Sequence, residues 1–157
     1  MNEKNTNELL KKYPVVFGQY KLPPTQTAMC WGFEHGDGWY SIIDCLAFII
    51  QRENKRVQEQ DKGAEPMQAV QVKQKFAGLR FYMNYETDIV HGAIRMAESM
   101  SYRICEDCGS TQDVKFTSSF YVQGLCKKCR KILLKTRVQF WLKRSMHYMR
   151  TVLKIRR

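Results

Sequence analysis

Four cysteines in two matched pairs constrain this chain more than any other feature. Cys105 and Cys108 form one Cys-x2-Cys pair, Cys126 and Cys129 form the other, and 17 residues separate the two pairs. This spacing is typical of a four-cysteine zinc site, in which each pair supplies two thiolates to one tetrahedral ion. We therefore predict one structural Zn²⁺ ion bound by these four side chains. The alternative interpretation is two disulfides or four unbound thiols.

The cysteine set also bears on catalysis. Four thiolates close the coordination sphere and leave no position for water or substrate. Zinc deaminases need a His-x-Glu sequence before their cysteine pair, but His35 is followed by Gly-Asp and His91 by Gly-Ala. HNH-type nucleases carry a histidine beside their cysteine pairs, and residues 109–125 contain none. The residues therefore predict a protein that is not an enzyme.

Charge is divided sharply along the chain. Residues 1–113 carry 13 Lys/Arg and all 15 Asp/Glu, whereas residues 114–157 carry 13 Lys/Arg and no acid. Such a basic block favours a polyanionic partner, either nucleic acid or an anionic membrane surface, or an acidic protein. Because residues 127–157 lack proline and glycine, we expect one helix of about 25–30 residues there. Its apolar side chains form one broad face, made of Leu134, Val138, Trp141, Leu142, Met149, Val152 and Leu153.

The leading hypothesis is electrostatic, weakly sequence-specific binding to the backbone of DNA or RNA. The residues expected to contact phosphates are Lys127, Lys128, Arg130, Lys131, Lys135, Arg137, Lys143, Arg144, Arg150, Lys154 and Arg157. An acidic protein surface is the alternative partner for the same basic helix, and membrane-surface association and self-association stay open. A charged helix face that is only solvated is the simplest alternative.

The fold class expected is α+β. We predict a short helix over residues 5–12, an irregular arm across the surface to Cys30 that contains Pro14, Pro23 and Pro24, and a helix that begins near Trp39. Alternating polar and apolar residues over 71–76 and 79–85 predict a β-hairpin with Ala77-Gly78 at its connection. Thr87 and Asp88 are expected to begin the next helix.

The predicted domains are an α+β body over residues 1–103, a four-cysteine module over 104–132 and a basic amphipathic helix over 133–157. The module is expected to be a treble clef or zinc ribbon: a knuckle at Cys108-Gly109, a small hairpin from residues 114–117 and 120–122, and then a helix that opens at the second cysteine pair. The preceding helix runs almost directly into Cys105, so we expect the module to dock on the body.

A second group of functional residue types lies around the start of the first long helix. Glu34, His35, Asp37 and Asp44 are candidates for a divalent ion site or an acid–base pair. The structural alternative is that Gly36-Asp37-Gly38 is a turn and that Asp37 caps the helix that follows. The two remaining cysteines, Cys30 and Cys45, lie in apolar surroundings and are expected to be buried.

The sequence predicts a cytoplasmic setting. The first residues contain no apolar stretch typical of a signal peptide. The longest apolar run, residues 42–50, is interrupted by Asp44 and is too short to span a bilayer. Reducing conditions favour metal binding over disulfides for paired cysteines.

With these motifs in view, the chain resembles a family of small proteins of tailed phages and prophages. The resemblance rests on the Gly-Asp-Gly-Trp turn at 36–39, the Val-Lys-x-Lys-Phe-x-Gly-Leu-Arg-Phe-Tyr hairpin at 72–82 and the two cysteine pairs, with Ala77 where the family has glycine. It covers roughly residues 29–130 and implies a phage accessory or host-takeover role in the bacterial cytoplasm. In that setting the acidic partner would be a host enzyme or defence complex, which the protein would bind and inhibit through its basic helix.

Overall fold

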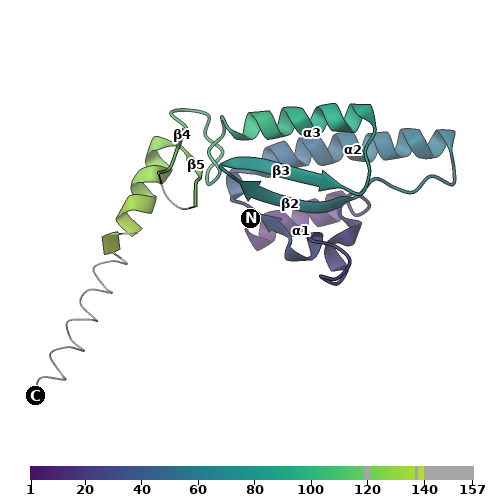
Figure 1. The fold of residues 1–157 in the computed structure, drawn as a ribbon, viewed down its shortest axis with the longest axis horizontal. Coiled ribbons are helices and arrows are strands. Elements are labelled where there is room, and N and C mark those ends of the chain that lie inside the picture. Colours follow the sequence, from purple (N-terminus) through teal and green to yellow (C-terminus); the bar gives the residue numbers. More distant parts are fainter. Residues whose placement is uncertain (119–120, 137, 140–157) are drawn as a thin grey trace, which may run out of the picture.

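The computed structural model describes residues 1–118, 121–136 and 138–139, and it confirms a mixed α+β fold (Figure 1). The body contains the predicted order of helix, hairpin and helix. In chain order its elements are α1 Glu3–Lys12, β1 Phe33–Glu34, α2 Tyr40–Gln60, β2 Ala69–Lys75, β3 Gly78–Met83 and α3 Asp88–Ser101. The four-cysteine segment follows with β4 Lys115–Phe116 and β5 Gly124–Leu125, and residues 127–136 are helical.

The body has one three-stranded sheet in the order β1-β2-β3. Strand β1 runs parallel to β2 with Phe33 opposite Val72, and β2 is antiparallel to β3 with Val72 opposite Phe81. The hairpin turn lies at Phe76-Ala77, one residue earlier than predicted. Both residues have positive φ, 51° and 63°, which is the backbone that a two-residue hairpin turn requires.

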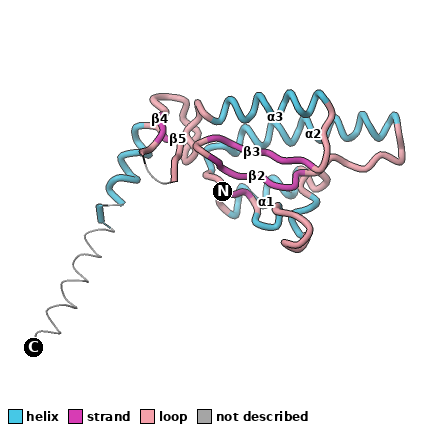
Figure 2. The backbone as a smooth tube through the Cα atoms, viewed as in Figure 1, coloured by secondary structure: helices cyan, strands magenta, loops and turns pink. Residues whose placement is uncertain are grey.

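Helices α2 and α3 form a layer against the sheet (Figure 2). Thr87 caps α3 as predicted, because its hydroxyl accepts a hydrogen bond from the Val90 amide. The apolar faces of both helices meet the sheet in one core. Its members include Trp39, Ile43, Leu46, Ile50, Leu79, Phe81, Val90 and Ile94.

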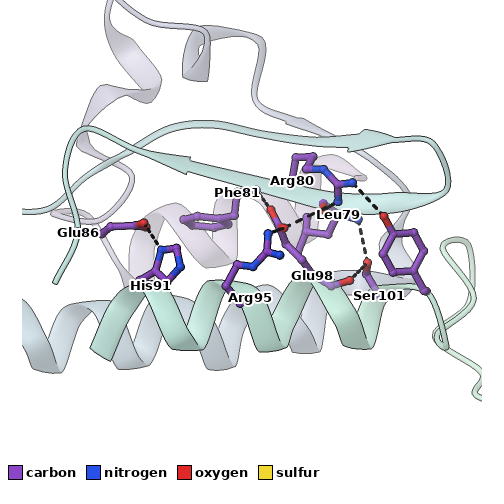
Figure 3. Close-up of polar contacts among 9 residues, drawn as sticks. Leu79, Arg80, Phe81, Glu86, His91, Arg95, Glu98 and Ser101 are labelled. Carbon is purple, nitrogen blue, oxygen red and sulfur yellow. Dashed lines mark hydrogen bonds and ion pairs between the residues drawn. The ribbon is translucent and has the colours of Figure 1, made fainter. Parts of the chain in front are cut away.

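Side chains of α3 close the outer edge of β3 (Figure 3). The Leu79 amide donates to Ser101 Oγ at 2.8 Å, and the Phe81 amide donates to Glu98 Oε1 at 3.3 Å. Glu98 also lies 3.9 Å from the Arg80 guanidinium. These contacts occupy amides that an edge strand would otherwise present to another strand.

The N-terminal arm is not confined to the surface, so this prediction was wrong. Val16, Phe17 and Met29 are almost fully buried. The Phe17 ring lies 5.0 Å from that of Phe33 and 6.3 Å from that of Phe81. The prolines break the helix without removing the arm's apolar side chains from the core.

The prediction for the unpaired cysteines was also wrong. Cys45 is exposed and Cys30 is half-buried. On α2 the buried positions around Cys45 are Ile42, Ile43, Leu46 and Ala47, and position 45 falls outside that stripe because a helix turns 100° per residue. Across the described residues, no helix is both long enough and apolar enough to cross a bilayer.

Candidate metal centre

The four cysteines predicted to bind metal lie together. Their sulfur atoms are all within 4.8 Å of one another, and Cys108 Sγ and Cys126 Sγ are 3.7 Å apart. Cys105, Cys126 and Cys129 are buried, whereas Cys108 is exposed. This is a donor set for one metal ion, with four ligand atoms in reach of a common centre.

Local backbone geometry explains how the two pairs converge. Cys105 and Cys108 lie in a tight loop closed by a hydrogen bond from the Gly109 amide to the Cys105 carbonyl at 2.9 Å. Gly109 has φ +76°, a conformation that glycine adopts without strain. Cys126 follows β5, and Cys129 lies in the first turn of the helix over residues 127–136.

Without a bound cation, the thiols differ in how readily they ionise. A hydrogen bond from the Cys129 backbone lowers the pKa of Cys126 to about 7. Burial raises the pKa of Cys105 and of Cys129. Since the thiolate is the form that binds metal, a divalent cation would supply the charge that allows all four to ionise.

Arg130 holds the module together from within. Its guanidinium donates to the carbonyl oxygens of Leu125 at 2.6 Å and Asp113 at 2.8 Å, and to Asp113 Oδ2 at 2.9 Å. The side chain of Arg130 is only 20% exposed. Its donors are therefore engaged inside the module, a role that the sequence did not distinguish from that of the neighbouring lysines.

The Gly-Asp-Gly-Trp turn docks on the first cysteine loop. The Gly38 amide donates to the Glu106 carbonyl at 2.7 Å, and the Trp39 indole donates to the Ile104 carbonyl at 3.1 Å. A Cβ atom on Gly38 would lie 2.0 Å from the Cys105 carbonyl oxygen and 2.4 Å from the Gly109 amide nitrogen. The module is thus docked on the body, as predicted, and Gly38 permits the close approach.

Glu106 and His35 are buried beside this junction. Glu106 accepts a hydrogen bond from the Gly36 amide at 3.3 Å, and burial raises its pKa. Burial lowers the pKa of His35 to about 4, and its Nδ1 lies 2.8 Å from the Gly36 carbonyl oxygen. Both side chains are therefore bound into the packing between the turn and the cysteine loop. No sequence pattern indicates a role for Glu106, because its environment forms only when residues 36 and 106 meet.

The candidate acidic residues around the start of α2 do not form one site. Asp37 accepts hydrogen bonds from Asn2 and Asn5 at the start of α1, so it does not cap α2 as predicted. Asp44 pairs with Lys12 at 2.7 Å, and Glu34 accepts a bond from Gln71. Within residues 1–118, 121–136 and 138–139, the four cysteines are the only group of at least three His, Cys, Asp or Glu side chains close enough to hold a metal ion.

The described basic residues from Lys127 onward are mostly open to solvent. Lys127, Lys128, Lys131 and Lys135 are exposed. The other residues predicted to contact phosphate, Arg137, Lys143, Arg144, Arg150, Lys154 and Arg157, lie outside the described residues.

The apolar side chains of this helix are also exposed where the structure describes them. Leu134 is 60% exposed and Val138 is 56% exposed. Leu133 instead packs against the cysteine cluster. The helix therefore contacts the module through its first turns and presents apolar as well as basic side chains to solvent.

The small hairpin of the module differs in one strand from the prediction. Strand β4 lies within the predicted residues 114–117, but its partner is Gly124–Leu125, with Lys115 opposite Leu125. Tyr121 and Val122 precede that strand. Gly124 and Leu125 are buried next to the cysteines, where the chain must turn into the metal-binding helix.

Comparison with known proteins gives no match: no protein-family model, no curated protein and no solved structure corresponds to this chain.

Proposed function

We propose that this protein is a non-enzymatic nucleic-acid-binding protein in which a zinc-stabilised module presents basic side chains to the phosphates of DNA or RNA. The observation that carries the proposal is the segregation of charge. No acid follows Asp113, and 13 Lys/Arg do. The four described lysines of the helix over residues 127–136 are all exposed. A helix that lacks acids forgoes the i,i+4 ion pairs that would stabilise it, and phosphates supply the missing counter-charge.

Zinc is the metal we propose for the cysteine cluster. Thiolates select soft or borderline ions, and tetrahedral four-thiolate sets are typical of structural zinc. The order of cysteine loop, two-stranded hairpin and cysteine-bearing helix supports a treble clef as the fold of this module. Bound zinc would offset half of the negative charge of the four thiolates and fix the two cysteine pairs to each other, which in turn would orient the lysines of the helix.

The proposed setting is the cytoplasm of a phage-infected bacterium. The resemblance to phage and prophage proteins supports it, together with the cysteine pairs, which suit a reducing compartment. There the protein would act as an accessory factor that binds nucleic acid electrostatically, with weak sequence preference.

The test is fluorescence anisotropy of the full chain with labelled duplex DNA, single-stranded DNA and RNA across a salt series. The test variant replaces Lys127, Lys128, Lys131 and Lys135 with alanine. The matched control replaces Lys4, Lys11, Lys21 and Lys62, which are equally exposed, so both variants lose the same charge.

Affinity should fall steeply with salt, since each phosphate contact contributes about 0.9 to the slope of log K against log salt for duplex DNA. The test variant should lower that slope by about 2–4, and the control should lower it by less than about 1. Equal loss in both variants, or affinity that does not change with salt, would refute the proposal. If the protein binds no nucleic acid but captures one acidic host protein, the inhibitor hypothesis replaces it.

A further inference from the structure

The two faces of the body sheet differ in chemistry. Val72, Leu79 and Phe81 point into the core and are buried. The opposite face carries Lys73 next to Arg80 in register, with Tyr82 on the same strand. Lys73 and Arg80 are half-buried, and Tyr82 is 41% exposed. Strand alternation thus places basic and aromatic side chains together on the face away from the core.

Cations and aromatic rings alternate on this face. Lys73 Nζ lies 5.9 Å from the Tyr82 ring centre, and Lys75 Nζ lies 5.6 Å from that of Phe76. The Arg80 guanidinium forms an ion pair with the Glu98 carboxylate at 3.9 Å. Within the described part of the chain, neither Lys73 nor Lys75 forms an ion pair with an acid, although Glu34 of β1 lies opposite Lys73 in register.

The same surface continues onto the cysteine module. Phe76, at the hairpin turn, is 74% exposed, and Phe116 of β4 is 57% exposed. Gly124 lies close to the hairpin turn and to Phe116: a Cβ there would be 3.6 Å from the Ala77 carbonyl and 3.8 Å from the Phe116 ring. The Phe116 ring also packs edge-on against Tyr102 at 6.1 Å. We call Lys73, Lys75, Phe76, Tyr82 and Phe116 the aromatic–basic face.

We infer that the aromatic–basic face binds single-stranded nucleic acid, with bases stacked on Phe76, Tyr82 and Phe116 and phosphates held by Lys73 and Lys75. Sequence-tolerant binding of single strands uses this combination of stacking rings and cations along the backbone. The inference rests on the proposed function, which it deepens. It names the form of nucleic acid, and it adds a second binding surface to that of the exposed lysines in the helix over residues 127–136.

The chemistry favours a single strand over a duplex. In a duplex the base faces are stacked on each other, and only the phosphates and groove edges are accessible. Two phenylalanines and a tyrosine would then gain no stacking, and the lysines alone would contribute. A single strand presents unstacked bases and phosphates together, which matches rings and cations that lie within 6 Å of each other.

The experiment compares the zinc-loaded full chain with Phe76→Ala, Tyr82→Ala and Phe116→Ala combined. The control combines Trp31→Ala, Phe48→Ala and Ile89→Ala, which are 66%, 50% and 56% exposed and lie outside the face. Phe48 has its own cation neighbour, Arg52 at 5.9 Å. Affinities are measured for a labelled oligothymidine and for a labelled duplex, with thermal unfolding to verify that both variants fold.

Wild type should bind the oligothymidine more tightly than the duplex at equal salt. The test variant should lose at least about tenfold for the single strand and less than about twofold for the duplex, with the control unchanged. If the test variant keeps full single-strand affinity while the four-lysine variant loses it, this inference is wrong and the proposed function stands. If wild type binds neither probe, both are wrong.

Discussion

Replacement of Gly38 by alanine should disrupt the junction between the body and the cysteine module. The added Cβ would lie 2.0 Å from the Cys105 carbonyl oxygen, 2.4 Å from the Gly109 nitrogen and 2.7 Å from the Glu106 carbonyl oxygen. All three are backbone atoms, which cannot rotate away as a flexible side chain can. The turn must therefore separate from the cysteine loop by more than an ångström.

The expected cost combines two effects. Overpacking of a tight contact costs about 1–3 kcal/mol, and loss of the hydrogen bond from the Gly38 amide to the Glu106 carbonyl adds about 1 kcal/mol. We expect Gly38→Ala to lower the free energy of unfolding by about 3 kcal/mol, which corresponds to a decrease in Tm of about 10 °C for a domain of this size.

Gly92→Ala is the matched control. Gly92 lies inside α3, and a Cβ there would meet nothing within 4 Å. Because alanine is the better helix former, this substitution should raise stability by about 0.5–1 kcal/mol. Urea unfolding of the zinc-loaded proteins, followed by circular dichroism, measures both. If the two variants unfold within about 0.5 kcal/mol of each other, the Gly-Asp-Gly-Trp turn does not dock as described.

Three further predictions concern the hairpin, the buried histidine and the metal. Ala77→Gly should stabilise the protein by about 0.5–1 kcal/mol in urea unfolding. Residue 77 has φ +63°, a conformation that costs a non-glycine residue about 1–2 kcal/mol. Equal or lower stability of the variant would contradict this prediction. Burial lowers the pKa of His35 to about 4 from 6.5, so the unfolded chain takes up the proton first, and about 3 kcal/mol of stability should be lost as pH falls from about 6.5 to 4. His35→Leu should flatten that dependence at saturating zinc, and an unchanged pH profile would refute it. Chelation of the metal should abolish hydrogen-exchange protection at the Cys105 and Arg130 amides and preserve it at the Leu46 amide. The reason is that the buried cluster of the module consists of Leu125 and three cysteines. Protection of the Cys105 and Arg130 amides that survives chelation would show that the module folds without metal.

The sequence predicted those features that local chemistry determines. The two Cys-x2-Cys pairs predicted that the four sulfur atoms would meet, because this spacing is typical of tetrahedral four-cysteine sites. The alternation in residues 71–83 sets the hairpin, and Thr87 caps α3 because its hydroxyl reaches the amide three residues later.

Other features depend on contacts between distant residues and could not be predicted in this way. Gly38 meets Cys105 only in the folded chain, so the Gly-Asp-Gly-Trp motif was interpreted as a local turn. Arg130 has the same charge as the lysines beside it, and only the positions of Asp113 and Leu125 show that its role is internal. Phe17 enters the core because Phe33 and Phe81 leave space beside the sheet.

The most direct test of this account is the metal content of the purified protein, measured by mass spectrometry under native and denaturing conditions. The account predicts one zinc ion for each folded chain, complete loss of the ion on unfolding and six free thiols afterwards, because Cys30 and Cys45 are unpaired as well. It also predicts that Cys129→Ser weakens zinc retention whereas Cys45→Ser does not, since Cys45 is exposed on α2 and lies outside the cluster. A folded protein without metal, or one with two disulfides among Cys105, Cys108, Cys126 and Cys129, would contradict the account.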